Sequence, residues 1–251
     1  MPARVANAII LRTYPLKEAD SIVSFFTREY GKGRGVAHSA RRSRRRFGAA
    51  LEPLTQVRIE YFEQEGRELC RLDRCEIVAS MTGAAGATYA TTVGLAYIVE
   101  TADRLLPEHE VNDHVFRLLV LVLEQIRRGQ SFWPALDYYL YWMVRLGGFL
   151  PDLSRCLQCG ATLGEEAEAS FDRQHTGLHC RGCRPMGGFA ISGAARRWAA
   201  RIARTSLAEL SDACPAPDLR LFLHQRIEDH LEGALKSWAL LEPLGRDGAG
   251  S

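Results

Sequence analysis

The first eighty residues consist of short apolar and β-branched runs separated by turn-forming residues. Val57, Ile59 and Tyr61 alternate with other residues in the period-two pattern of a strand that has one buried face. Similar runs predict strands at residues 7–14, 21–28, 33–38, 57–62 and 68–78. Because closure removes exposed edges, these strands favour a small closed or nearly closed barrel over residues 1–80. We expect an OB-fold β-barrel, and an SH3-like barrel is the alternative that strand count leaves open.

A helical period replaces this alternation after the small, breaker-rich segment 81–86. Apolar residues three and four apart form stripes of the kind that face the core of a helical bundle. Three stripes precede the cysteine-rich region: one ends before Pro107, one runs from an Asn112 or Asp113 cap to Gly129, and one covers about 134–147.

Two further stripes follow the cysteine-rich region. Ser192 can cap a helix that contains Trp198 and Ile202, and a last long stripe runs from Leu219 to Trp238. Residues 245–251 are expected to be a frayed tail. The chain is thus predicted to be an α+β multidomain protein with a barrel (1–80), the first part of a helical domain (81–155), an inserted four-cysteine module (156–183) and the second part of the helical domain (184–251).

Two Cys-x-x-Cys knuckles separated by 20 residues lie in that module, at Cys156, Cys159, Cys180 and Cys183. This spacing is typical of one structural zinc ion in a closed tetrahedral site, which leaves no open position for catalysis. No secretory signal is visible in the first residues, so a cytoplasmic chain is expected and metal is favoured over disulfides. His175 and His179 lie between the knuckles and are expected to be bystanders.

Charge is distributed unevenly along an otherwise ordinary globular composition. The chain has 251 residues, is 47% hydrophobic and 25% charged, and has a net charge of only +2. No apolar run reaches the roughly 18 residues that suggest a membrane span. Residues 1–50 nevertheless contain eleven Lys and Arg against three acids. This asymmetry points to a polyanion as the partner of the amino-terminal part.

The densest basic feature is a run of five arginines within six residues, 41–46. Five guanidinium groups repel one another and cannot be buried together, so the run must face solvent or a polyanion. A solvated basic face is the simpler alternative. The candidate nucleic-acid contacts are Arg28, Lys32, Arg34, His38, Arg41, Arg42, Arg44, Arg45 and Arg46. Candidate stacking residues are Phe25, Phe26, Tyr30, Phe47 and Tyr61, at least half of which we expect in the barrel core.

No catalytic constellation is visible, and a non-enzymatic protein is expected. The chain has neither a phosphate-binding Gly-x-x-x-x-Gly-Lys loop nor a Gly-x-Ser-x-Gly elbow. The glycine-rich segment 31–35 is interpreted as a turn between strands. Cys70 and Cys75 lie five apart on a predicted strand and should face opposite sides, and Cys214 is solitary; each is read as a buried thiol.

Three stretches carry a family resemblance: TREYGKGRGVAHSAR at 27–41, LEPL at 51–54, and LGGFLPDL at 146–153 directly before the first cysteine knuckle. With the order of barrel, helices, cysteine module and helices, the whole chain resembles the RecO family of bacterial recombination mediators. One departure concerns His38, because members of that family often carry Lys-Gly-Ala-Arg where this chain has His-Ser-Ala-Arg.

The resemblance implies a non-enzymatic role in DNA repair. It implies binding of single- and double-stranded DNA, annealing of strands coated with single-strand-binding protein, and loading of RecA together with RecR, in the cytoplasm and at the nucleoid. Two other classes of function stay open from the residues themselves. One is an RNA-binding or ribosome-associated zinc protein, and the other is a nuclease or nucleotidyl transferase.

Overall fold

The computed structural model describes residues 3–16, 18–40, 42, 46–63, 66–82, 88–173, 177–210 and 216–247. They form two compact units, Met1–Gly129 and Gln130–Ser251, and each is described by itself. This division by compactness groups the first two helices with the barrel. The domain limits expected from the sequence, with a boundary at 80/81, stay a prediction.

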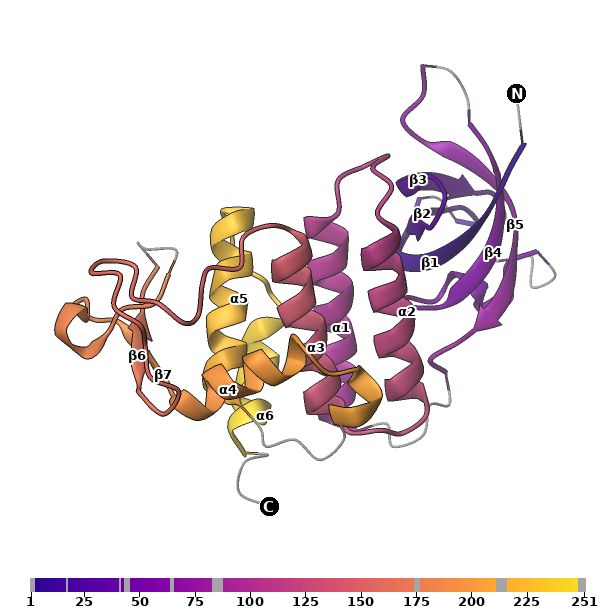
Figure 1. Ribbon diagram of the computed structural model, residues 1–251. Coiled ribbons are helices and arrows are strands. Elements are labelled where there is room, and N and C mark those ends of the chain that lie inside the picture. Colours follow the sequence, from indigo (N-terminus) through magenta and orange to yellow (C-terminus); the bar gives the residue numbers. More distant parts are fainter. Residues whose placement is uncertain are drawn as a thin grey trace. The chain divides into compact units, whose positions relative to one another are not determined.

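The first unit contains a closed five-stranded barrel (Figure 1). Its strands are β1 (Ala3–Pro15), β2 (Ser21–Thr27), β3 (Gly31–Ala37), β4 (Gln56–Phe62) and β5 (Cys70–Ala79), and the short helix η1 (Gly48–Leu51) lies between β3 and β4. β1 pairs antiparallel with both β2 and β4, while β3 pairs parallel with β5. The resulting order β1-β2-β3-β5-β4 is that of an OB-fold, which confirms the predicted fold class and rules out the SH3-like alternative.

A shift in register on β5 changes which residues reach the barrel core. The ladder between β4 and β5 is irregular between Glu60 and Tyr61, so β5 carries one extra residue. As a result Cys70 and Cys75 both lie in the core, 8% and 7% exposed. The prediction that they face opposite sides was wrong, because a bulge inverts the alternation on which it relied. Burial raises the pKa of each thiol to about 12.

The glycine-rich segment 31–35 is strand β3, so its interpretation as a turn was also wrong. A Cβ at Gly35 would lie 2.6 Å from the sulfur of Cys70, and one at Gly33 would lie 3.1 Å from the ring of Phe25. At Gly33 and Gly35, glycine is therefore required because the strand passes close to core side chains, and turn geometry is not the reason.

Two helices pack against the barrel within the same unit (Figure 1). They are α1 (Tyr89–Leu105) and α2 (Asp113–Arg127). Asn112, one of the two caps that the sequence offered, caps α2, because its side chain accepts a hydrogen bond from the Val115 N–H at 3.0 Å. Asp103 on α1 accepts a hydrogen bond from Ser24 Oγ at 2.8 Å, and this contact joins the helix to β2.

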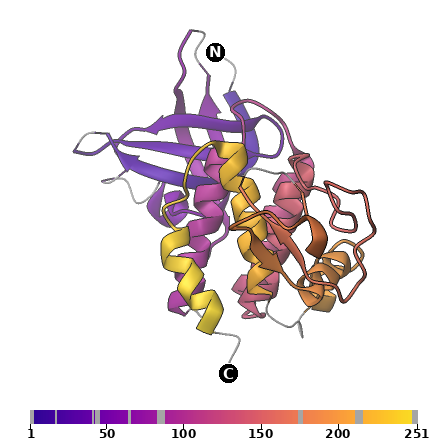
Figure 2. The same cartoon turned by 90° about the vertical axis from the view of Figure 1, so that its left-hand side faces the viewer.

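The second unit is a helical bundle with a small hairpin. Its elements are α3 (Phe132–Leu146), β6 (Ala169–Phe171), η2 (Arg181–Cys183), β7 (Phe189–Ile191), α4 (Gly193–Ile202), η3 (Leu207–Leu210), α5 (Pro217–Leu231) and α6 (Trp238–Asp247). α5 contacts α3, α4, α6 and β7, so it is the central helix of this unit (Figure 2). The predicted cap at Ser192 is confirmed, since its hydroxyl accepts from the Ala195 N–H at 3.1 Å. Within the described ranges no helix is both long and apolar enough to cross a lipid bilayer.

The last apolar stripe is divided between two helices. α5 ends at Leu231 because Glu232 adopts a left-handed φ of +50°, and the chain resumes as α6 at Trp238. Leu235 and Trp238 are still buried, so the apolar pattern continues across the break and suggested one helix. Gly245 lies inside α6 and is not part of a tail, whereas residues 248–251 lie outside the described residues.

Candidate metal centre and nucleic-acid interface

Four cysteine sulfurs converge in the second unit. The Sγ atoms of Cys156, Cys159, Cys180 and Cys183 all lie within 4.8 Å of one another. Each pair is presented by a tight turn: the Gly160 N–H donates to the Cys156 carbonyl at 2.9 Å, and the Cys183 N–H donates to the Cys180 carbonyl at 3.0 Å. The four cysteines that the sequence singled out are therefore brought together, and they could hold a metal ion.

The pKa shifts of two thiols of the cluster, Cys156 and Cys183, have opposite directions. Desolvation raises the pKa of Cys156, but N–H groups, including that of Cys180 at 3.3 Å from its sulfur, outweigh burial and lower the pKa to about 6. Hydrogen bonds with the side chains of Cys180 and Cys159 raise the pKa of Cys183 to about 12. A bound cation would displace the remaining protons and leave four thiolates. His179 is buried but is not a member of this cluster, and His175 lies outside the described residues.

Two of the cations proposed as nucleic-acid contacts, one directly after β2 and one on β3, form ion pairs within the first unit. Arg28 Nε lies 2.6 Å from Asp113 Oδ1, and Arg34 Nε lies 2.8 Å from Glu108 Oε1. Both acids belong to the α1–α2 region, so these ion pairs join the barrel to its helices. Half-exposed pairs of this kind contribute little stability, but they do reduce the charge that β2 and β3 present to a polyanion.

Lys32 is engaged in a similar way. Its Nζ donates to the Asp103 carbonyl at 2.7 Å, and burial lowers the pKa of this lysine despite the nearby carboxylates of Asp103 and Glu108. The structure thus gives Lys32 a part in the contact between β3 and α1.

His38 lies at the end of β3, beside Asp20. The ring Nδ1 is 3.1 Å from Asp20 Oδ2, and the other oxygen of that carboxylate accepts from the Ser39 N–H at 2.9 Å. The contact closes the turn that leads into the arginine run.

The described members of the arginine run, Arg42 and Arg46, differ in their surroundings. Arg42 is 73% exposed, and its nearest acid, Glu18 at 3.6 Å, is 93% exposed, so this pair is weak. Arg46 donates from Nε and Nη2 to the Asp73 carbonyl at 3.0 and 2.9 Å, which anchors the end of the run to β5. Arg41, Arg44 and Arg45 lie outside the described residues.

Most of the candidate stacking residues belong to the core, as expected. Phe25, Phe26, Phe47 and Tyr61 are at most 3% exposed. Tyr30 is 37% exposed, and the Arg4 guanidinium lies 4.4 Å from its ring centroid. Tyr30 is therefore the most exposed member of this set, and Arg4 covers one face of its ring.

A cavity of about 340 Å³ lies beside Tyr30 on the barrel. Its walls include Lys32 and Arg34 from β3 and Arg67 from the approach to β5. Arg67 escaped the sequence analysis because it carries no motif and reaches this place only through the pairing of β3 with β5. Glu63 and Glu68 also line the cavity, so its charge is mixed.

The chain matches two family models that adjoin near the predicted junction at 81–86. Residues 1–81 match the model described as Recombination protein O N terminal, and residues 87–239 match Recombination protein O C terminal. Together they cover the barrel, the helices and the cysteine cluster.

Proteins named DNA repair protein RecO are similar over nearly the whole chain. That of Koribacter versatilis is 43% identical over 244 residues, covering 95% of this chain and 98% of the relative. That of Anaeromyxobacter sp. (strain K) is 33% identical over 245 residues, covering 95% and 96%. That of Geobacter metallireducens is 37% identical over 169 residues, covering 67% and 68%. The chain belongs to the recombination protein O family of DNA repair proteins.

Proposed function

We propose that the protein is a non-enzymatic recombination mediator of the cytoplasm and nucleoid that binds single- and double-stranded DNA. In this proposal it anneals complementary strands coated with single-strand-binding protein and, together with RecR, assists the loading of RecA. The observation that carries the proposal is the similarity to DNA repair proteins RecO, at 43% identity over 95% of the chain. An OB-fold barrel, a common platform for nucleic acids, supports it.

The arginine run is the proposed centre of DNA binding. Within residues 1–50, three cations already contact groups of the first unit: Arg28, Lys32 and Arg34. The arginine run 41–46 therefore supplies much of the remaining positive charge of residues 1–50. Neutralising phosphates on two strands lowers their mutual repulsion and lets complementary bases meet without ATP. Contacts with about five phosphates of a single strand correspond to a slope of about −3.5 in log K against log salt.

The metal in the cysteine cluster is proposed to be one structural zinc ion. Four thiolates suit zinc, and a tetrahedron with sulfurs about 2.3 Å from the ion has edges of about 3.8 Å. The Sγ atoms of Cys159 and Cys180 lie 3.8 Å apart. A set of four protein ligands leaves no position for substrate, so the ion would brace the loops before α4.

The first test is annealing of complementary strands coated with single-strand-binding protein, without ATP. The informative variant changes Arg41, Arg42, Arg44 and Arg45 to alanine and keeps Arg46, which binds the Asp73 carbonyl. The matched control removes four arginines that each have a carboxylate partner, Arg117, Arg127, Arg128 and Arg173.

Rapid annealing by the native protein and by the control, with loss in the loop variant, is the expected result. Absence of annealing by the native protein would contradict the proposal, and preference for RNA in direct competition would favour an RNA-binding protein. Equal annealing by all three would keep the mediator function and exclude the arginine run as its centre.

A further inference from the structure

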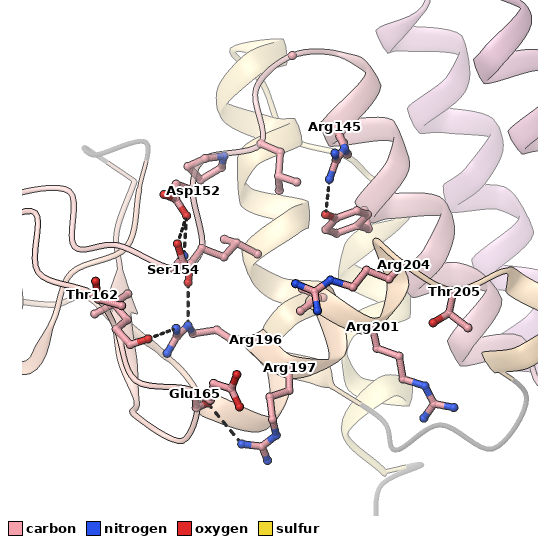
Figure 3. A pocket seen from close by; sticks show the side chains of 18 residues that line it. Arg145, Asp152, Ser154, Thr162, Glu165, Arg196, Arg197, Arg201, Arg204 and Thr205 are labelled. Atoms are coloured by element: carbon pink, nitrogen blue, oxygen red, sulfur yellow. Dashed lines mark hydrogen bonds between the residues drawn. The ribbon is translucent and has the colours of Figure 1, made fainter.

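A second arginine-rich surface lies in the unit Gln130–Ser251. It is a pocket of about 910 Å³ formed by the C-terminal ends of α3 and α4 and by the loops on either side of the first cysteine knuckle (Figure 3). Its charged lining comprises Arg145, Arg196, Arg197, Arg201 and Arg204, together with Asp152 and Glu165. Apart from Asp152, which lies in the segment 146–153, these residues did not enter the sequence analysis, because they are spread over sixty positions and form no motif.

Two of the five arginines have structural roles. Arg196 is buried, and its guanidinium donates to four backbone carbonyls, those of Leu153, Leu163, Gly164 and Ala167, at 2.8–3.0 Å. Arg197 pairs with Glu166. The N–H groups of Arg196 therefore already have acceptors, and Arg197 already has a carboxylate partner.

The other three arginines are exposed. Arg145 lies over the Trp142 ring, 5.3 Å from the centroid, and Arg201 lies over Trp198 at 5.7 Å. Arg145 donates to the Tyr141 hydroxyl and Arg201 donates to the Glu209 carbonyl, and both acceptors are neutral oxygens. Considering only residues that the structure describes, no carboxylate forms a salt bridge with Arg145, Arg201 or Arg204.

An indole face orients a guanidinium without neutralising it, so the N–H edges stay available to an anion. Arg145, Arg201 and Arg204 line the helical side of the pocket, while Asp152 and Glu165 line the side next to the cysteine module (Figure 3). Basic residues at the ends of helices also complement the helix dipole, which explains Arg145 and Arg201 in part. Arg204 lies two residues beyond the end of α4.

The position of these charges favours a phosphodiester backbone over an acidic peptide. A peptide seated in the pocket would meet the carboxylates of Asp152 and Glu165 and the saturated guanidinium of Arg196. A nucleic-acid strand that follows the helical side would meet only exposed guanidinium groups, whose planar forks match phosphate oxygens.

We infer that Arg145, Arg201 and Arg204 form a second nucleic-acid site, which binds the phosphate backbone of a strand without reading its sequence. The inference deepens the proposed function and rests on it, because it assigns a further site to a protein proposed to bind DNA. A protein with two backbone sites can hold two strands, which is what annealing requires.

The test measures binding of a fluorescein-labelled oligothymidylate strand by anisotropy over a series of salt concentrations. Changing Arg145, Arg201 and Arg204 to glutamine should reduce the magnitude of the salt slope by about 2, since each single-strand phosphate contact contributes about 0.7. The corresponding triple lysine variant should keep most of the slope, because its charges remain. The control replaces Arg117, Arg127 and Arg128, which pair with carboxylates, and should match the native protein. Far-ultraviolet circular dichroism verifies the fold of each variant, because Arg145 and Arg201 lie over indole rings whose fluorescence the substitutions would change.

If the triple glutamine variant shows the same salt slope as the native protein, the inference is overturned. Binding of an acidic, apolar-ended peptide that is lost in this variant while the DNA slope persists would overturn it in favour of a protein-docking site. The variant with alanine at positions 41, 42, 44 and 45 is measured in parallel. It separates the claim of DNA binding by the arginine run from the claim of a second site. If only the loop variant loses slope, the proposed function stands and the second site fails; if the native protein binds no DNA, both fail.

Discussion

Arg220 donates from Nε to Asp137 Oδ1 over 2.8 Å, and their side chains are only 3% and 1% exposed. The other carboxylate oxygen accepts from Trp198 Nε1 at 3.1 Å, so one buried acid joins α3, α4 and α5. The Trp133 ring lies 4.3 Å from the Arg220 guanidinium and covers it. A buried pair of this kind gives little net stability when intact, but removing one partner leaves an uncompensated buried charge.

Asp137→Ala is therefore expected to lower the free energy of unfolding by about 3–5 kcal/mol. Urea denaturation followed by tryptophan fluorescence measures the effect, since Trp133 and Trp198 flank the pair. Glu165→Ala removes an exposed acid of the same unit whose carboxylate has no hydrogen bond or ion pair among the described residues, and it serves as the control, with a change expected within about 0.5 kcal/mol. Similar midpoints for both variants would contradict this account of the pair.

Gly31 and Gly66 both have a left-handed φ of +75°, but only Gly31 lies close to neighbouring atoms. Comparing them separates the effect of backbone strain from that of a close contact. A Cβ at Gly31 would lie 2.3 Å from the Glu110 carbonyl oxygen, whereas a Cβ at Gly66 would meet nothing within 4 Å. Gly66→Ala should cost only the left-handed strain of about 1–2 kcal/mol. Gly31→Ala should cost clearly more, because β3 must also move away from the α1–α2 loop. Thermal unfolding of the two variants tests the difference, and equal losses would show that the contact is not tight.

The buried thiols of Cys70 and Cys75 predict a loss of stability in alkali. Burial raises the pKa of each to about 12, so between pH 9 and that value the folded chain keeps protons that the unfolded chain releases. Stability should then fall as pH rises above 9, by about 1.4 kcal/mol per pH unit for each thiol.

Urea midpoints measured from pH 8 to pH 11 test this expectation. The variant Cys75→Ala lowers stability at every pH because it leaves a cavity. Above pH 9, however, its stability should fall less steeply with pH than that of the native protein, by the contribution of one thiol, about 1.4 kcal/mol per pH unit. An unchanged slope would mean that Cys75 ionises in the folded state.

The cysteine cluster predicts one zinc ion per chain in protein purified under reducing conditions. Cys156→Ser should lose the metal and lower the thermal stability of the second unit, because the loops before α4 depend on it. Cys75→Ala, which removes a thiol of the barrel, should retain the ion. Elemental analysis measures the content, and a metal-free native protein would refute the assignment.

Local patterns were sufficient for much of this protein. The five strands were predicted from alternation and turn residues, and the caps at Asn112 and Ser192 from the preference of polar side chains for helix starts. The convergence of the four cysteines follows from two knuckles, each closed within four residues. The family follows from extended sequence similarity. In each case the information lies in residues that are close together along the chain.

Long-range packing decided the rest. The bulge that turns Cys75 inward arises from the pairing of β5 with β4, and the break after Leu231 is invisible in an apolar pattern that continues across it. The sequence showed where basic residues of the first unit are concentrated along the chain. Only the tertiary structure showed that Arg28 pairs with Asp113, 85 positions away.

The sequence by itself therefore determined the elements, the fold class, the family and the cysteine cluster, because these depend on local periodicity and spacing. The tertiary structure alone decided which charges are neutralised. Arg28 meets Asp113 because folding brings together groups from distant parts of the chain, whereas Arg145 lies over Trp142, which precedes it by only three positions on α3. Among the described residues, folding brings no carboxylate into a salt bridge with Arg145, and this depends on parts of the chain that no local pattern connects.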